Sequence, residues 1–179
     1  MARSMAAPPL TLRPATAADI PALAALGRDS FVAKFGDLYR PEDLAAFLAQ
    51  SHAEPVVASQ IADPRMRIVL AESAGALAGY CKLWLACAWP KHARGANTVE
   101  LVQIYTAPGA SGGGIGSALM DWALAEARAF GADEIQLSVW SGNEGAQRFY
   151  ERYGFEKIAD IDFWVGQQRD DEFLFARML

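Results

Sequence analysis

The chain has 179 residues and a net charge of −5, with 53% hydrophobic and 21% charged residues. This length fits one compact domain, and a chain of this size buries roughly 70% of its unfolded surface without help from a disulfide or a metal. Acidic and basic residues are interspersed, which disfavours nucleic acid as a partner because phosphate binding needs a basic footprint. The small acidic excess is compatible with a cationic substrate, although such an excess more often serves solubility.

Cysteine usage and the N-terminus restrict the class of protein further. Cys81 and Cys87 are the only cysteines, and their spacing matches no metal-binding or redox motif, so we expect reduced thiols and no metal. Residues 1–8 predict a loose leader ahead of a single domain at 9–179. The sequence has no signal-peptide pattern and no stretch of roughly 18 apolar residues. We therefore expect a cytoplasmic protein without a membrane partner.

The first third of the chain predicts one strand followed by two helices. Residues 11–13 form the strand, and Thr16 with Asp19 three residues later makes a capping box that opens the first helix. Pro41 occupies the N1 position of the second helix, and the polar stretch after it leaves room for a third, shorter helical segment. The apolar faces have a period near 3.6 and consist of Ile20, Leu23, Leu26, Phe31 and Phe35 in the first helix and Leu44, Phe47 and Leu48 in the second.

The rest of the chain alternates predicted strands with two more helices. One helix covers residues 115–130 and ends at Gly131, and the other begins after Asn143 and closes at Gly154. Residues 89–97 are expected to form a loop. Strands are expected at 67–72, 77–85, 98–106, 134–139, 155–164 and 172–178, the last two joined by a polar hairpin at 167–171. The resulting order, β-α-α-β-β-β-α-β-α-β-β, predicts an α/β or α+β domain of three layers.

A run of glycines at 112–116 separates the strand at 98–106 from the helix at 115–130. Glycines let the backbone approach a ligand closely, and the free N–H groups of a helix N-terminus favour an anion. We therefore expect a phosphate-binding turn, with a merely flexible turn as the alternative. No Lys-Ser or Lys-Thr follows the run, so it does not match the Walker A motif of nucleotide-binding P-loops. Leu119 stands where the dinucleotide-binding fingerprint needs its third glycine, so that motif does not match either.

Two segments resemble the hallmarks of the GNAT superfamily of N-acetyltransferases. The segment Ser111-Gly112-Gly113-Gly114-Ile115-Gly116 resembles its coenzyme A-binding motif, Q/R-x-x-G-x-G/A, with Ser111 at the position of Gln or Arg. The second hallmark, N-x-x-A-x-x-F-Y-x-x-x-G-F after a strand, is matched by Asn143, Ala146, Phe149, Tyr150, Gly154 and Phe155. The two motifs occur in the family's order and at its separation.

The resemblance covers residues 9–179 and implies a central mixed, mostly antiparallel sheet with helices on both faces. It also implies an enzyme that moves the acetyl group of acetyl-coenzyme A directly to a primary amine of a small molecule or a peptide. Weaker matches, such as Ser138-Val139-Trp140 and Phe163-Trp164-Val165-Gly166, resemble the PaiA-type spermidine/spermine N-acetyltransferases and favour a polyamine-like acceptor. The alternative is a coenzyme A-binding regulatory domain without efficient turnover, and a homodimer stays open.

The resemblance further implies roles for single residues. Deprotonating an amine of pKa ~10.4 at pH 7 costs about 4.6 kcal/mol, so a positioned carboxylate is useful as a proton acceptor. Glu100 lies at the family's common base position, with an exposed strand glutamate as the alternative, and Tyr150 would donate a proton to the leaving thiolate. Backbone groups of Ile104 and Thr106 would bind the pantetheine arm, and the Thr106 amide would polarise the acetyl carbonyl. The implied coenzyme-binding set is Ile104, Tyr105, Thr106, Ser111, Gly112, Gly113, Gly114, Ile115, Gly116, Ser117, Asn143, Ala146, Phe149, Tyr150 and Arg152.

Overall fold

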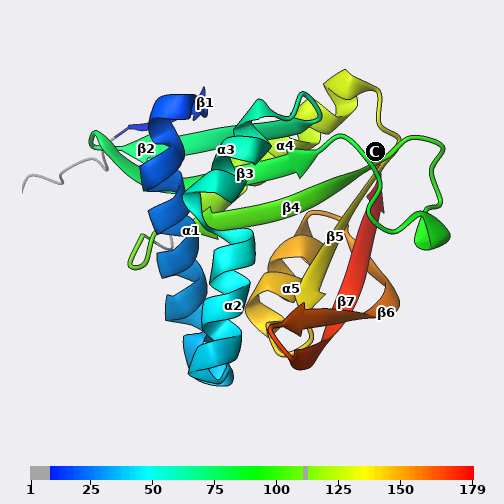
Figure 1. The fold of residues 1–179 in the computed structure, drawn as a ribbon. Coiled ribbons are helices and arrows are strands. Elements are labelled where there is room, and N and C mark those ends of the chain that lie inside the picture. Colours follow the sequence, from blue (N-terminus) through cyan, green and yellow to red (C-terminus); the bar gives the residue numbers. More distant parts are fainter. Residues whose placement is uncertain (1–8, 111–112) are drawn as a thin grey trace, which may run out of the picture.

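Seven strands form one sheet in the computed structural model, which describes residues 9–110 and 113–179. The strand order is β1-β2-β3-β4-β5-β7-β6, and each neighbouring pair is antiparallel except the parallel pair β4–β5 (Figure 1). This confirms the expected mixed, mostly antiparallel sheet. The strands are Leu10–Pro14 (β1), Met66–Ser73 (β2), Ala76–Trp84 (β3), Thr98–Thr106 (β4), Glu134–Trp140 (β5), Glu156–Val165 (β6) and Gln168–Met178 (β7).

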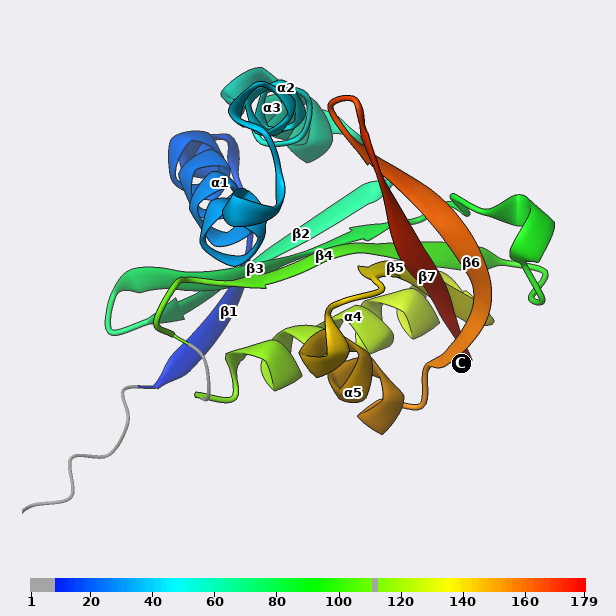
Figure 2. The same cartoon turned by 90° about the horizontal axis from the view of Figure 1, so that it is seen from below.

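Helices cover both faces of the sheet, as expected (Figure 2). Three of them, α1 (Ile20–Phe35), α2 (Pro41–Ser51) and α3 (Glu54–Ala62), lie on one face. The other two, α4 (Ile115–Phe130) and α5 (Glu144–Arg152), lie on the opposite face. Within the described ranges, none of these helices combines the length and the hydropathy needed to cross a bilayer.

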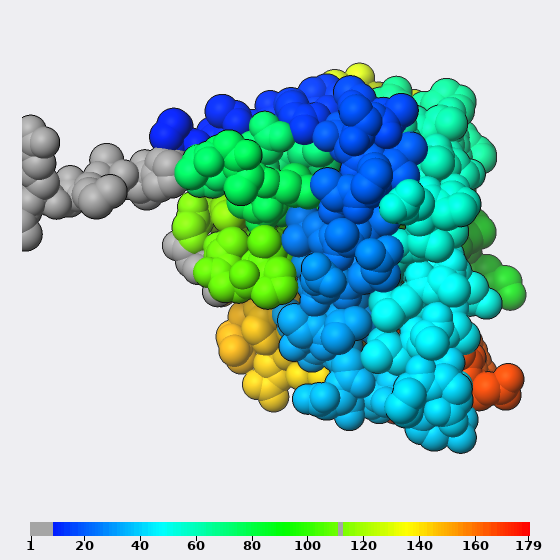
Figure 3. All heavy atoms as spheres, turned by 60° about the vertical axis from the view of Figure 1, so that its left-hand side comes forward, coloured from blue at the N-terminus to red at the C-terminus, as the bar shows by residue number. Residues whose placement is uncertain are grey.

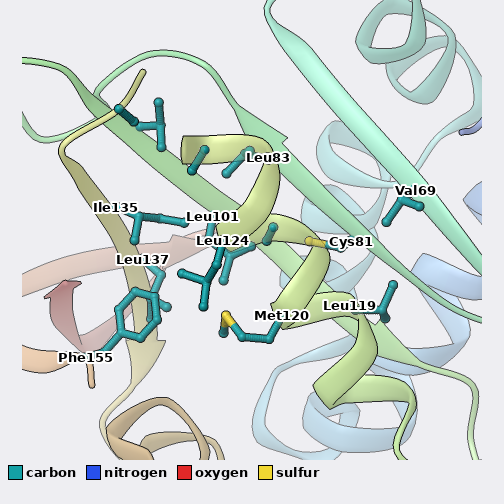
Figure 4. Packing of buried hydrophobic residues seen from close by; sticks show 14 of the residues in the cluster. Val69, Cys81, Leu83, Leu101, Leu119, Met120, Leu124, Ile135, Leu137 and Phe155 are labelled. Atoms are coloured by element: carbon teal, nitrogen blue, oxygen red, sulfur yellow. The ribbon is translucent and has the colours of Figure 1, made fainter. Parts of the chain in front are cut away.

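The larger core lies between α4 and the sheet (Figure 4). Alternate strand residues such as Cys81, Leu101 and Leu137 point toward α4. They pack against Leu119 and Met120 from the apolar stripe of this helix. The helix ends where the sequence predicts, at Gly131, whose φ of +88° is the left-handed conformation of a C-cap. This packing fixes where the N-terminus of α4 meets the end of β4.

A second, smaller core lies between the opposite face of the sheet and α1 and α3, which Figure 3 shows over this face in blue and cyan. Leu23 and Val57 pack there against Leu70 and Tyr80. The predicted pair of Thr16 and Asp19 is present, with the Thr16 N–H donating to the Asp19 carboxylate at 2.7 Å. It caps a short 3₁₀ turn at Ala17–Asp19, from which α1 continues.

The strands β4 and β5 pair over a short stretch and then separate, as Figure 1 shows. Their parallel ladder consists of three pairs, from Thr98↔Glu134 to Glu100↔Gln136. Beyond Glu100, β4 contains one residue more than its other neighbour β3, because Lys82 pairs with Gln103 and Leu83 with Leu101. This bulge re-aims the strand and increases its twist. The sheet therefore opens into a split between β4 and β5.

Three local expectations are corrected by the structure. The stretch after α2 forms a full helix, α3, which the predicted element order omitted. The loop at 89–97 contains a 3₁₀ turn at Pro90–His92. The hairpin expected at 167–171 is present but its turn is shorter, because Val165 pairs with Gln168 across a tight turn and β7 begins there. The leader at 1–8 and the site residues Ser111 and Gly112 lie outside the described residues.

Candidate active site

A cavity of about 680 Å³ occupies the split between β4 and β5. Its walls include residues of α1 and α2 on one side and of α5 on the other. These helices cover opposite faces of the sheet, so the cavity reaches both faces through the split. The residues expected from the sequence that line it are Glu100, Ile104, Tyr105, Thr106, Asn143, Ala146 and Tyr150.

The edge of β4 offers free backbone groups to the cavity. The Ala107 N–H donates to the Ala78 carbonyl at 2.8 Å, which fixes the hydrogen-bonded positions of the β3–β4 ladder. Because such positions alternate in an antiparallel ladder, Ile104 and Thr106 turn their N–H and C=O groups away from β3, toward the split. The Thr106 carbonyl accepts a bond from Ser30 Oγ at 3.1 Å. The Thr106 N–H and both polar groups of Ile104 therefore face a cavity rather than a strand.

Tyr105, between these two residues, points its side chain to the face of the sheet that α1 and α2 cover. Its ring lies 5.4 Å from the ring of Tyr80 and 6.0 Å from that of His52, measured between centroids. Burial raises the pKa of Tyr105 above its usual range. Tyr105 thus helps to pack α1 and α2 onto the sheet and forms part of the cavity wall.

Glu100 lies at the point where the split begins, as the last β4 residue paired with β5. Its side chain is half-buried, and burial raises the pKa of its carboxyl to about 7. A carboxyl group with this pKa is divided between its acid and base forms near neutral pH, which suits a group that accepts a proton. The alternative of an exposed strand glutamate is therefore not what the structure shows.

Tyr150 enters the cavity from α5, on the face opposite α1. Its ring is held by Phe149 and Phe155, at centroid distances of 5.5 and 5.9 Å. Burial raises the pKa of the Tyr150 hydroxyl above its usual range, so the hydroxyl is protonated at neutral pH and can donate a hydrogen bond. A buried tyrosine hydroxyl usually has a partner, and this one faces the cavity.

The glycine turn places the N-terminus of α4 beside α5. Gly114 has a φ of +76°, a left-handed conformation that glycine adopts without strain, and α4 begins at the next residue, Ile115. The first intrahelical bond runs from Ala118 to the Gly114 carbonyl, so the N–H groups before Ala118 have no partner of this kind. Gly113, Gly114 and Ser117 are exposed. The turn therefore presents backbone donors and the positive end of a helix dipole.

The start of α5 supplies the remaining expected residues. The Asn143 side chain accepts a bond from the Ala146 N–H at 3.2 Å, which confirms Asn143 as the N-cap. Phe149 packs its ring next to Gly116, where a Cβ would meet it at 3.7 Å. Arg152 is exposed and holds its guanidinium 5.9 Å from the Phe149 ring centroid. These residues connect the cavity to the glycine turn.

The sequence did not predict several of the residues that line the cavity. Glu172 on β7 lines the cavity and is 8% exposed, although its neighbours were predicted to form a hairpin. Aromatic rings from α1, α2, β5 and β6 complete the wall, namely Phe31, Phe35, Phe47, Trp140, Phe163 and Trp164. The aromatic residues were visible in the sequence, but no local pattern tells a cavity wall from a core.

Comparisons with solved structures show the same fold. A PaiA N-acetyltransferase from Thermoplasma acidophilum, solved in complex with coenzyme A, superposes with a TM-score of 0.79 at 19% identity and covers 96% of this chain and 99% of its own. A putative acetyltransferase from Salmonella typhimurium, solved with acetyl-coenzyme A, gives a TM-score of 0.66 at 21% identity, covering 96% of this chain and 94% of its own.

Sequence relatives point the same way. An uncharacterized N-acetyltransferase of Lactobacillus delbrueckii is 30% identical over 161 residues, which are 90% of this chain and 92% of that protein. One of Mycobacterium tuberculosis is 32% identical over 162 residues, covering 90% and 98%. The model of the "Acetyltransferase (GNAT) family" matches residues 29–155. The chain is therefore an N-acetyltransferase that belongs to the GNAT family.

Proposed function

We propose that this enzyme transfers the acetyl group of acetyl-coenzyme A to a primary amine of a small, polyamine-like molecule, using the split between β4 and β5. The observation that carries the proposal is the free backbone edge of Ile104 and Thr106, which faces a cavity shared by Glu100 and Tyr150. An extended pantetheine arm can bond to such an edge as an added strand would. The PaiA-type relative in the same fold, solved with coenzyme A, supports this assignment.

The residues around the split fit a coenzyme of this kind. The N-terminus of α4 would hold the pyrophosphate through the amides of Gly114, Ile115 and Gly116, since no basic side chain is needed there. Ile104 and Thr106 would hold the arm, and Asn143 and Ala146 form the wall across the split. Bound in this way, the coenzyme supplies an acetyl group activated as a thioester. Ser111 and Gly112 belong to the proposed phosphate turn by sequence.

The protein groups then divide the proton chemistry between them. Glu100, directly or through a water, accepts the proton that the attacking amine must lose. An N–H on the free edge of β4, that of Ile104 or Thr106, donates to the oxygen that becomes negative as the amine adds to the acetyl carbonyl. The Tyr150 hydroxyl donates to the departing sulfur, whose conjugate acid has a pKa near that of cysteine, ~8.5. Glu100 belongs to β4 and Tyr150 to α5, and both side chains line this cavity.

A direct test is release of coenzyme A thiol over a panel of polyamines, amino acids and peptides. We expect turnover with small polyamines first, because both cavity carboxylates and the aromatic wall favour a cation. Turnover with peptides alone would show that the acceptor is a peptide amine and not a polyamine. Coenzyme binding without thiol release from any amine would instead favour the regulatory domain.

Binding itself should be visible as a rise in the melting temperature. A ligand that binds only the folded state at 100 times its Kd adds about 2.7 kcal/mol, which corresponds to roughly 5–10 °C for a chain of this size. Differential scanning fluorimetry with and without acetyl-coenzyme A measures this shift. An unchanged melting temperature at millimolar coenzyme would contradict the site.

Replacing Gly114 by Val should abolish that shift. A branched side chain at the start of α4 would block the close approach of a phosphate to the backbone. The substitution also costs folding free energy, because φ is +76°. Gly75, in the β2–β3 turn, has the same φ of +76° and the same open space around it, so Gly75→Val is a matched control for this strain. We expect Gly75→Val to keep the coenzyme-induced shift, and a Gly114→Val variant that also kept it would exclude the turn as the phosphate site.

A further inference from the structure

Two buried carboxylates lie on the same face of β7, two residues apart, and one of them has an oxygen without a hydrogen-bond partner among the described residues. Asp170 is 9% exposed and accepts hydrogen bonds from the Tyr39 hydroxyl and the Gln168 amide. Glu172 is 8% exposed and has Ser138 as a side-chain hydrogen-bond partner, but its Oε2 has no hydrogen-bond partner in the described part of the chain. An unpaired buried carboxylate is costly unless a ligand or a cation completes it. Of the two, only Glu172 lines the cavity.

The surroundings of Glu172 favour a cation. Trp140 stands directly opposite it in the β5–β7 ladder, and Phe163 and Trp164 lie on the next strand. The wall continues through edge-to-face contacts, with Phe35 at 6.0 Å from Trp140 and Phe47 at 5.6 Å from Phe163 between ring centroids. Aromatic faces beside a carboxylate attract ammonium groups.

The charges that reach the cavity agree with this reading. Among the described residues, Glu100 and Glu172 line it against one cation, Lys34. Burial lowers the pKa of Lys34 and raises that of Glu172. The cavity therefore has an acidic excess, and the Oε2 atom of Glu172 has no partner among the described residues.

Glu172 and Glu100 lie too far apart to hold the same ammonium group. Glu100 pairs with Gln136 and Glu172 with Trp140, four residues further along β5. At strand geometry this is about 13 Å along the sheet and about 10 Å across it, so the two α-carbons are roughly 16 Å apart. Two glutamate side chains shorten this gap without closing it, and each carboxylate meets a different part of an elongated acceptor.

We propose that Glu172 is a specificity-determining residue that binds a second ammonium group of the acceptor, distinct from the nitrogen that is acetylated near Glu100. The proposal rests on the acetyltransferase function proposed above and deepens it. The acceptor is then a dication whose two nitrogens are separated by a flexible alkyl chain, and the aromatic wall packs against that chain.

The test compares two acceptors that differ in one nitrogen, diaminooctane and octylamine. In the wild-type enzyme, kcat/KM should be about 10- to 100-fold higher for diaminooctane, as expected for a charge-assisted bond inside a cavity. In Glu172→Gln this preference should fall to about threefold or less, while kcat for octylamine stays unchanged and Glu172→Asp restores part of the preference. A wild-type enzyme without preference, or a variant that keeps it, would overturn the role of Glu172.

Asp171→Asn is the matched control. Asp171 neighbours Glu172 but points to the opposite face of β7, where it is exposed and pairs with Arg169 at 3.2 Å. The control removes the same charge without touching the cavity, so it should keep the preference for diaminooctane. If Glu172→Gln lowers kcat for both amines equally and changes the pH profile, Glu172 acts on the reacting nitrogen, and the proposal is wrong.

Binding of hexamethonium separates this proposal from the acetyltransferase function, because its two quaternary ammonium groups cannot be acetylated. Calorimetry on the wild-type protein should show binding at least about 10-fold tighter than that of octyltrimethylammonium, through the ionic and cation–π attraction of the second quaternary group, and Glu172→Gln should remove the difference. Equal binding of the two probes by the wild-type protein would overturn the role of Glu172 even where thiol release is normal. This measurement on the wild type also decides the matter if Glu172→Gln does not fold.

Discussion

Replacing Tyr150 by Phe should lower kcat about 100-fold and leave the Kd for acetyl-coenzyme A nearly unchanged. The substitution removes one hydroxyl and keeps the ring that packs between Phe149 and Phe155, so the fold should be undisturbed. The hydroxyl is protonated at neutral pH, and its bond to sulfur strengthens only as the thioester breaks. Steady-state kinetics together with calorimetric coenzyme binding measures both quantities.

Tyr153→Phe is the control for this experiment. Tyr153 is one turn further along the chain, outside the cavity, and its hydroxyl donates to the Ser117 carbonyl at 3.4 Å. Its loss should leave kcat close to the wild-type value. If Tyr150→Phe weakened coenzyme binding and turnover together, Tyr150 would be an anchor of the bound coenzyme. Full activity would reduce it to a packing residue.

Replacing Glu100 by Gln should lower kcat by about 100- to 1,000-fold, because the amide cannot accept the proton of the attacking amine. The pH dependence of kcat in the wild-type enzyme should reflect the ionisation of Glu100. Burial raises the pKa of Glu100 to about 7, so the carboxylate form is scarce below pH 7 and predominates above it. We therefore expect kcat to rise tenfold per pH unit below this value and to level off above it.

The variant should lose this midpoint as well as the rate. Measuring kcat at saturating acceptor reports ionisation in the bound complex, where the free amine's own titration does not enter. His52 lies outside this range, since burial and the nearby charge of Lys82 lower its pKa to about 4. If the Glu100→Gln enzyme kept the same midpoint near pH 7, the rise of kcat with pH would be due to another group.

Local chemistry made much of this fold predictable. The capping pair of Thr16 and Asp19, the apolar stripe of α4 and its Gly131 cap are contained within one or two turns of chain, and the structure has each of them. The N-cap role of Asn143 is local in the same way. The side chains of such elements report on neighbours that are close in sequence.

The site depended on contacts that no local pattern contains. The bulge in β4 and the end of its pairing with β5 come from strands that meet across the sheet, so the width of the split could not be derived from residues 98–106 alone. Polar residues at 167–171 resembled a turn because their partners are distant. Asp170 accepts a hydrogen bond from Tyr39, and Asp43 accepts one from the Gln167 N–H at 2.8 Å. These contacts hold the β6–β7 hairpin against α2 and the residues just before it.

The short joint between β4 and β5, a ladder of three residue pairs, also divides the sheet into two parts that can open separately. Within the described ranges, backbone hydrogen bonds connect the two halves of the sheet only over residues 97–100 and 133–136, whereas the packing of α4 spans both halves through Leu101 and Leu137. Amide hydrogens of β5, β6 and β7 can therefore exchange with solvent as one cooperative unit while β2, β3 and β4 stay protected. A molecule bonded to the free edge of β4 and wedged against α5 would tie the two units together and slow exchange on both sides of the joint.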